Sequence, residues 1–290
     1  MISAKPILVT GASGKTGRRV IAELAARGAW VRAFIRRPAV ADELTRSGAQ
    51  EIAIGDLGDR ESLVRALTGA GQVLHICPPL HPREDAIAKE LIELAAGQGV
   101  DRFVLYSVMH PLLSNVPNHA RKLEAERHLV NSGLTYTILQ PIRYMQHLAT
   151  VWPSVIRDGV HCMPFSTKAK ISAVDLADLA EAAALVMTTP GHEAATYQLA
   201  GPHALSQEDM AAILTRILGR PIRAAARPFE EVRRDAEAAG LPAERIATMG
   251  MMSAHYDAHG LVGNPNVLRW ILGREPTTYE AFVRREMPLS

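Results

Sequence analysis

The chain has 290 residues, of which 48% are hydrophobic, so it is long enough to bury a large core with an added lobe. Its formal net charge of +2 gives no indication of a nucleic-acid partner. The two cysteines, Cys77 and Cys162, form neither a Cys-x-x-Cys motif nor a disulfide framework. The polar start is too short for a signal peptide, and no apolar run has the length of a membrane helix. We therefore expect a cytoplasmic protein that contacts neither nucleic acid nor a membrane.

Short apolar runs and helical patterns alternate along the first half of the chain. The expected strands are 7–9, 31–35, 52–54, 73–77, 103–106 and 136–139. The expected helices are 15–27, 40–47, 61–67, 85–96 and 119–131. This alternation predicts an α/β fold, a doubly wound parallel Rossmann sheet with helices on both faces.

The second half is less regular. The expected elements are a helix over 175–187, a strand over 196–200, a helix that begins after Ser206 and reaches 218, and short helices over 230–239 and 279–285. We expect residues 1–150 to form the nucleotide-binding core, with 171–203 returning to it. Residues 151–170 and 204–290 are expected to form a smaller, mostly helical substrate-binding lobe.

A glycine-rich loop follows the first expected strand and opens the first helix. Gly11, Gly14 and Gly17 have the spacing G-x-x-G-x-x-G, which is related to the dinucleotide fingerprint. Glycines permit a tight turn and a close approach to a pyrophosphate, which the free N–H groups of the helix start attract. Side-chain donors are available from Ser13, Lys15 and Thr16. The alternative is a plain glycine turn, but the position between strand and helix favours a phosphate loop.

The residue after the second strand indicates which nucleotide binds. NAD-binding proteins usually carry Asp or Glu there, whereas this chain has Arg36, followed by Arg37. A guanidinium can pair with a 2′-phosphate in a forked geometry, so we expect NADP(H). The alternative is a solvated turn arginine, which suits Arg37 better than Arg36. Asp56 and Leu57 end the third strand, where they can contact the adenine, although Asp56 could instead cap the next helix.

Further cofactor contacts are expected at the carboxyl ends of the remaining strands, where doubly wound sheets bind ligands. The expected contacts there are Ile76, Cys77, Pro78, Ser107 and Pro141. We interpret His75 and Cys77 as residues that set the shape of this edge rather than as catalytic groups.

Several segments together resemble the NmrA-like family of atypical short-chain dehydrogenases/reductases. The segments that carry the resemblance are Thr-Gly-Ala-Ser-Gly-Lys-Thr-Gly at 10–17, Arg36, Gly-Asp-Leu at 55–57, Tyr106-Ser107, His119-x-x-Lys122-x-x-x-Glu126, 132–141, 174–177, 197–202 and 218–220. They cover almost the whole chain. The resemblance implies either an NADPH-dependent quinone or dye reductase, or an NADP-binding redox sensor.

Short-chain dehydrogenases typically use Tyr-x-x-x-Lys, and the resemblance assigns the lysine to Lys122 as a contact to the nicotinamide ribose. Asn118 stands where the tyrosine would be, so the usual proton donor is missing. The alternative for Lys122 is a surface lysine paired with Glu126 at i+4. His119 and Tyr144 are the other candidate acids, and water could deliver the proton instead.

No metal site is expected, because His255 and His259 share a helix face without a clear third ligand. We expect an NADPH-dependent oxidoreductase that transfers hydride to a small, mostly apolar acceptor such as a quinone, enone, imine or dye. One alternative is a non-enzymatic NADP(H) sensor that binds a partner protein, and another is an isomerase or dehydratase with bound NAD(H). The chain is expected to be a monomer or a homodimer, and the sequence does not name the acceptor.

Overall fold

The computed structural model describes residues 5–288, which form two compact units. Within the described residues, the first unit comprises 5–114, 118–140 and 179–197. The second unit comprises 115–117, 141–178 and 198–288. Each unit is described by itself below.

The first unit is built on a sheet in the order β3-β2-β1-β4-β5-β6-β8. Its strands are β1 Ile7–Val9, β2 Val31–Ile35, β3 Glu51–Ile54, β4 Gln72–His75, β5 Arg102–Tyr106, β6 Tyr136–Pro141 and β8 Ala195–Leu199. Neighbouring strands from β3 through to β6 pair in parallel. The strand order reverses between β1 and β4, which is the switch point where doubly wound sheets bind their ligands.

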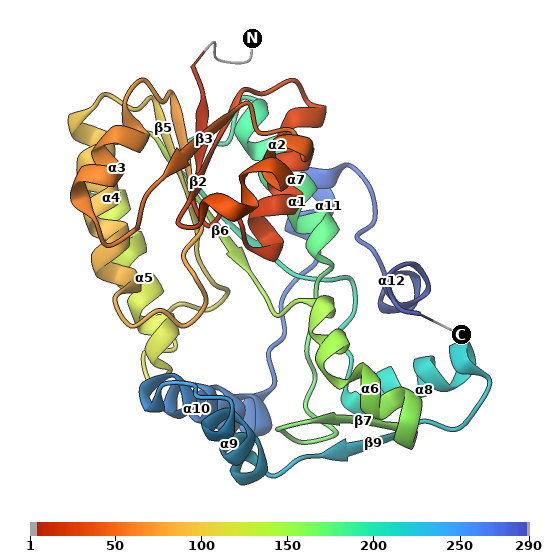
Figure 1. The fold of residues 1–290 in the computed structure, drawn as a ribbon. Helices are drawn as coiled ribbons and strands as arrows, with labels where there is room; N and C mark the ends of the chain where they lie inside the picture. Colours follow the sequence, from red (N-terminus) through yellow and green to blue (C-terminus); the bar gives the residue numbers. More distant parts are fainter. Residues whose placement is uncertain (1–4, 289–290) are drawn as a thin grey trace. The chain divides into compact units, whose positions relative to one another are not determined.

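Helices cover both faces of this sheet, with α3, α4 and α5 on one side and α1, α2 and α7 on the other (Figure 1). Their bounds are α1 Lys15–Ala26, α2 Ala41–Arg46, α3 Arg60–Leu67, α4 Glu84–Gly97, α5 Pro117–Val130 and α7 Leu176–Thr188, with a 3₁₀ turn η1 at Pro38–Val40. A continuous apolar cluster joins α3, α4 and α5 to the strands through Leu63, Leu91, Phe103, Leu129 and Ile138. Burial of this apolar face is the main force that holds the layers together. The predicted doubly wound α/β fold is confirmed.

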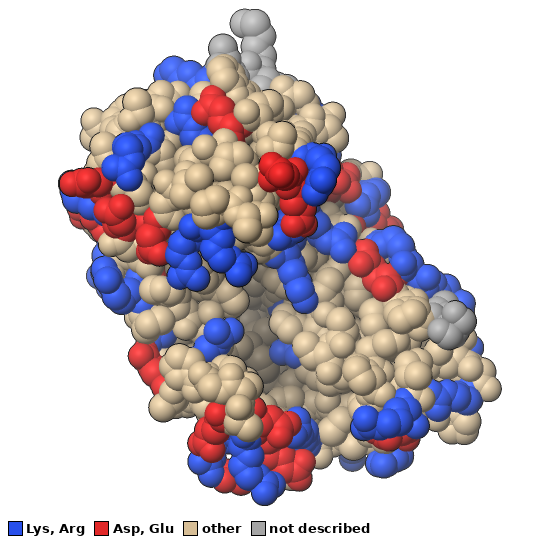
Figure 2. All heavy atoms as spheres, in the orientation of Figure 1, with Lys and Arg blue, Asp and Glu red and all other residues tan. Residues whose placement is uncertain are grey.

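The second unit is mostly helical and also contains a small sheet. Its elements are η2 Met145–His147, α6 Leu148–Asp158, β7 Val160–Met163, α8 Gln207–Leu218, β9 Arg223–Ala226, α9 Phe229–Ala238, α10 Ala243–His259, α11 Asn266–Leu272 and α12 Tyr279–Glu286. As predicted, Ser206 caps α8, and it forms a reciprocal capping box with Asp209. Over α9 the acidic and basic side chains are intermixed (Figure 2), because they pair along the helix.

The structure corrects three details of the sequence prediction. The fourth strand ends at His75 rather than at Cys77. The lobe contains the parallel pair β7 and β9, which alternation did not predict. The helix α6 was not predicted at all, because Pro153 lies inside it. None of the helices in residues 5–288 is both long and apolar enough to cross a membrane.

Candidate functional site

The glycine loop of the first unit has no room for side chains at two of its three glycines. Gly11 adopts φ +62°, and a Cβ there would lie 2.5 Å from the carbonyl oxygen of Ile76. A Cβ on Gly17 would lie 2.4 Å from the carbonyl oxygen of Gly11. The N-cap of α1 is Gly14, so no side chain caps the first turn of this helix. A loop of this shape presents backbone N–H groups to an anion at a helix start.

The other predicted loop residues lie around this turn. Thr16 is buried and Lys15 is exposed at the start of α1. Ser13 is half-buried, and its carbonyl accepts a hydrogen bond from Nε of Arg18 at 2.8 Å. The exposed ammonium of Lys15 therefore lies on the helix turn that would face an anion.

Arg36 and Asp56 lie at the ends of two neighbouring strands, β2 and β3. Nη1 of Arg36 is 3.9 Å from Oδ2 of Asp56, and both side chains are more than half exposed. So loose and exposed a pair contributes little to stability, and it leaves the forked donors of the guanidinium open to another anion. Arg37 is also exposed, and Leu57 is half-buried against the core cluster.

The ends of β1 and β4 are joined by a buried network. Oγ1 of Thr10 lies 2.9 Å from Nδ1 of His75 and accepts a hydrogen bond from the N–H of Ile76 at 3.0 Å. Burial, together with the nearby Lys122, lowers the pKa of His75 to about 3, so this imidazole is neutral at neutral pH. Burial raises the pKa of Cys77 to about 12, with a further contribution from Glu84. At neutral pH His75 is therefore uncharged, and Cys77 is a thiol rather than a reactive thiolate. The adjoining Pro78 is exposed.

Lys122 is an enclosed lysine rather than a surface one. Its Nζ lies 2.6 Å from Oε1 of Glu84 and donates a hydrogen bond of 2.6 Å to the carbonyl oxygen of Tyr106. The side chains of Lys122 and Glu84 are 13% and 4% exposed, respectively. Such a pair holds the ammonium in one place at the carboxyl end of β5.

A buried carboxylate lies next to this pair. Glu126 accepts hydrogen bonds from the hydroxyl of Ser107 and from Nε2 of Gln140, at 3.0 and 2.9 Å for the latter. Burial raises the pKa of Glu126, whereas the two hydrogen bonds oppose that shift. Since Ser107 donates its only hydroxyl proton to this carboxylate, toward a cofactor it can act only as an acceptor.

His119 is fully buried in α5, and its Nδ1 lies 2.9 Å from the carbonyl oxygen of His110. A carbonyl oxygen only accepts, so Nδ1 carries the proton. His110 has a left-handed backbone with φ 55°, which is unusual for a residue with a side chain. The hydrogen bond from His119 thus holds a strained turn in place.

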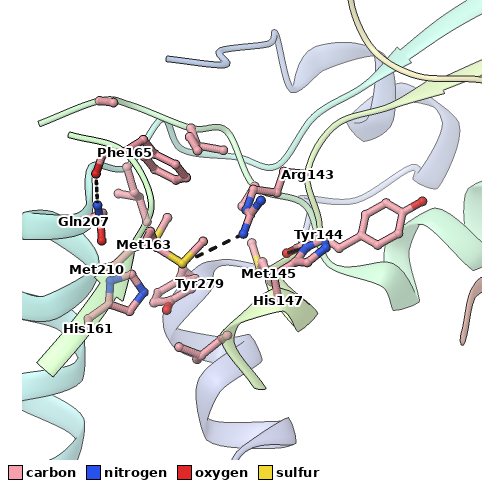
Figure 3. A pocket seen from close by; sticks show the side chains of 15 residues that line it. Arg143, Tyr144, Met145, His147, His161, Met163, Phe165, Gln207, Met210 and Tyr279 are labelled. Atoms are coloured by element: carbon pink, nitrogen blue, oxygen red, sulfur yellow. Dashed lines mark hydrogen bonds between the residues drawn. The ribbon is translucent and has the colours of Figure 1, made fainter. Parts of the chain in front are cut away.

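The second unit contains an apolar cavity with about 420 Å³ of empty space, part of it open to solvent (Figure 3). The side chains that line it are those of Arg143, Tyr144, Met145, His147, Leu148, His161, Met163, Phe165, Ala169, Ile171, Ala173, Leu205, Gln207, Met210 and Tyr279. The predicted candidate Tyr144 lies at this cavity, where its ring is directed away from Met163 and Phe165 (Figure 3). Pro141 is buried at the end of β6.

Two buried aspartates, Asp175 and Asp178, hold the C-terminal segment 274–285, which includes the cavity residue Tyr279. Asp178 accepts from Arg274 at 2.8 Å and from the N–H of Thr277 at 2.6 Å. Asp175 binds Arg285 at 2.5 Å. These contacts flank Tyr279 in sequence and so fix the helix that brings it to the cavity.

Sequence reasoning did not single out several residues that the structure makes prominent: Glu84, Gln140, Arg143, His161, Gln207 and Tyr279. Glu84 directly precedes the helix expected over 85–96, and the start of a helix is a favourable place for any carboxylate. Arg143 lies two residues after the end of the sixth strand, near the edge where ligands bind, and that position was the available signal. His161, Gln207 and Tyr279 come from three distant parts of the chain, and no sequence pattern joins them.

The sheet order and the glycine loop define a doubly wound, Rossmann-type protein. The model of the NmrA-like family matches residues 3–282. The chain therefore belongs to the NmrA-like family, as its sequence motifs predicted.

The chain is also similar to several named reductases over most of its length. The chain is 30% identical over 279 residues to an NAD(P)H azoreductase from Xenophilus azovorans, with 96% of each chain covered. It is 34% identical over 242 residues to (4-alkanoyl-5-oxo-2,5-dihydrofuran-3-yl)methyl phosphate reductase from Streptomyces griseus subsp. griseus, covering 82% of this chain and 81% of that one. Among solved structures, an NADPH-dependent quinone oxidoreductase from Escherichia coli in complex with NADPH superimposes with a TM-score of 0.85. It has 27% identity and covers 97% of this chain and 100% of that one.

Proposed function

We propose that this protein is an NADPH-dependent reductase that transfers hydride to a small, mostly apolar acceptor of the quinone or dye type. The observation that carries the proposal is the pairing of a side-chain-free glycine loop with an exposed, loosely paired Arg36 at the end of the neighbouring strand. The relatives named for azo, quinone and butenolide phosphate reduction support the same reaction class.

The residues of the first unit fit a dinucleotide with a 2′-phosphate. The backbone of the loop from Gly11 to Gly17, with Lys15, would bind the pyrophosphate. Arg36 would bind the 2′-phosphate, while Asp56 and Leu57 would contact the adenine. The same edge of the sheet offers Ile76, Cys77, Pro78 and Ser107 for the nicotinamide half. When bound, NADPH supplies the hydride.

Lys122 would hold the nicotinamide ribose. Glu84 and the carbonyl of Tyr106 already hold its ammonium in position. Binding of the ribose would therefore cost little of the conformational entropy of the lysine side chain. The proton that accompanies the hydride needs a separate source, because Asn118 replaces the usual tyrosine. We keep Tyr144 as the candidate donor, with water as the alternative, and we regard His119 as a structural residue because its Nδ1 proton is committed to His110.

Calorimetric titration with NADPH and NADH tests the nucleotide half of the proposal. We expect Arg36→Asp to weaken NADPH binding roughly 10- to 100-fold, which corresponds to the loss of one or two charge-assisted hydrogen bonds, and to leave NADH binding nearly unchanged. Arg46→Asp is the matched control, since Arg46 is an exposed arginine in the last turn of α2. Equal losses for the two nucleotides would contradict the assignment of the 2′-phosphate to Arg36.

NADPH oxidation in the presence of a panel of quinones, enones and azo dyes tests the reaction. We expect turnover above the rate without enzyme for at least one acceptor. Tight NADPH binding without turnover of any acceptor would refute the reductase and favour the redox-sensor alternative that the missing tyrosine leaves open.

A further inference from the structure

The cavity of the second unit contains one permanent charge and no opposite charge. None of its fifteen described lining residues is Asp or Glu. The guanidinium of Arg143 has no carboxylate within 4.0 Å among the ion pairs of the described residues. Its neighbours are instead Sδ of Met163 at 4.0 Å from Nη2 and the ring of Phe165, 5.8 Å from Cζ to the centroid. Arg143 therefore presents an uncompensated cation to an apolar cavity.

Three further polar groups around the same cavity have unused hydrogen-bonding capacity. Among residues 5–288, no hydrogen-bond partner is present for Nδ1 of His161, Oε1 of Gln207 or the hydroxyl of Tyr279, and each of these residues is 3% exposed or less. Gln207 is fixed by a hydrogen bond of 2.7 Å from its Nε2 to the carbonyl of Phe165. All three side chains lie around the cavity with Arg143 (Figure 3). A buried polar group without a partner is unfavourable, so this arrangement is suited to a ligand that provides partners.

The protonation states of these groups indicate whether the ligand carries a negative or a positive charge. Burial lowers the pKa of His161 to about 4, the nearby charge of Arg143 adds to the shift, and the neighbouring side chain of Gln207 opposes it. His161 is thus neutral at neutral pH and has one N–H to donate. Tyr279 is protonated there as well, because burial raises the pKa of its hydroxyl. The cavity therefore combines one forked cation with two neutral donors, the imidazole of His161 and the hydroxyl of Tyr279, and with one acceptor, Oε1 of Gln207. The cation and the two donors complement an oxyanion, and the acceptor suits a hydroxyl or N–H of the same ligand.

We propose that this cavity binds the acidic group, a carboxylate, sulfonate or phosphate, of an otherwise apolar molecule, with Arg143 as the anchor for the oxyanion. Apolar contact comes from the walls formed by Met145, Leu148, Ile171 and Ala173. If the proposed function holds, the ligand of this cavity is the acceptor, so the inference rests on that function for the role of the ligand. The acceptor is then an apolar molecule with an anionic group, and a cationic dye of similar size binds less well.

A matched pair of fluorescent probes tests the site without turnover. The anionic probe is 1-anilinonaphthalene-8-sulfonate, and the neutral probe is N-phenyl-1-naphthylamine, which lacks the sulfonate. Both are titrated into the full chain as wild type, Arg143→Met and Arg157→Met. The last variant is the control, because Arg157 is an exposed arginine of α6 that is paired with Asp158.

We expect the wild type and Arg157→Met to bind the sulfonate at least tenfold more tightly than the neutral probe. We expect Arg143→Met to weaken sulfonate binding at least tenfold and to change neutral-probe binding less than twofold. Arg143→Lys, which keeps the charge but loses the fork, should be intermediate. Equal affinity of the wild type for the two probes would overturn the proposal, and so would an unchanged sulfonate affinity in Arg143→Met. The wild-type comparison decides the question even if the variants fold poorly.

NADPH titration and acceptor turnover, measured on the same preparations, separate this inference from the proposed function. Sulfonate binding that depends on Arg143, without reduction of any acceptor, would support the anion site and refute the reductase. Reduction of neutral and anionic quinones at the same kcat/KM, with no selectivity between the probes, would support the reductase and refute the anion site.

Discussion

Neutralising Glu84 isolates the contribution of the enclosed pair that holds Lys122. Glu84→Gln keeps the size of the side chain and a carbonyl oxygen near Nζ, but it removes the negative charge 2.6 Å from the ammonium. The Lys122 side chain is only 13% exposed, so water cannot fully replace the lost partner. Removing one member of a buried pair typically costs 3–5 kcal/mol, and the retained hydrogen bond places our expectation at about 3 kcal/mol.

The neighbouring residue provides a matched control. Asp85 also lies in the first turn of α4, and its carboxylate is 4.0 Å from Nζ of Lys89, with about a third of each side chain exposed. Asp85→Asn makes the same change of charge at the same end of the same helix. Because this pair is longer and more exposed than the Glu84–Lys122 pair, we expect a cost of only about 0.5 kcal/mol. The difference between the two variants therefore reports the burial of the Glu84–Lys122 pair.

Thermal unfolding and urea denaturation without nucleotide measure both variants. A cost of about 3 kcal/mol corresponds to a decrease of about 5 °C in Tm for a chain of this length. The double variant Glu84→Gln/Lys122→Met should recover part of the loss, because it removes the uncompensated cation. A Glu84→Gln variant within 0.5 kcal/mol of Asp85→Asn would refute the reasoning, since the pair would then behave as a solvated one.

Three further outcomes are expected. Gly17→Ala should abolish NADPH binding and lower Tm, because its Cβ would lie 2.4 Å from a carbonyl oxygen of the loop. The control Gly97→Ala should do neither, because no described atom lies within 4 Å of the added Cβ. The pKa of His75 is depressed to about 3, so the stability that the neutral ring contributes is present above pH 6.5 and is lost as pH falls toward 3. His75→Gln should therefore remove about 2 kcal/mol of the stability difference between pH 8 and pH 5, as measured by urea denaturation, and an unchanged difference would exclude this role. Iodoacetamide at pH 8 should alkylate the half-buried Cys162 well before the buried Cys77, whose pKa of about 12 leaves almost no thiolate, and peptide mass spectrometry would show the order.

The first unit was predictable because its signals are local. Each strand is a short apolar run that ends in a polar or glycine residue, and each helix has an apolar face of normal length. The strands β2 and β5 lie within one residue of the predicted bounds. The glycine loop was predictable because the steric requirement at Gly17 arises within the loop, from the carbonyl oxygen of Gly11 six residues earlier.

The second unit was less predictable because its structure depends on contacts between distant segments. The strand β9, Arg-Ala-Ala-Ala, has no β-branched or aromatic residue, and it pairs with β7 about sixty residues earlier. In α6, Pro153 normally argues against a helix interior. The cavity was not predictable for the same reason, because Arg143 and Tyr279 are far apart in the sequence and come together only through tertiary packing.

The His-x-x-Lys-x-x-x-Glu segment of α5 shows how one motif can have two roles. The sequence suggested chemistry, but in the structure all three side chains contact the end of β5 or the segment after it. His119 contacts the carbonyl of His110, Lys122 the carbonyl of Tyr106, and Glu126 the hydroxyl of Ser107. Three contacts along one helix face fix the backbone over 106–110, where nicotinamide is expected in a doubly wound sheet.

These three contacts give the motif a structural role that does not depend on any proton transfer. A residue that only donates a proton can be replaced by water, whereas a helix that shapes the cofactor edge cannot lose its anchors without moving that edge. His119→Phe would keep an aromatic ring, although a larger one, and remove the bond to His110. We therefore expect it to weaken NADPH binding, measured by calorimetry, while leaving the pH dependence of kcat unchanged. A shifted pH profile with intact NADPH affinity would instead identify His119 as the proton donor.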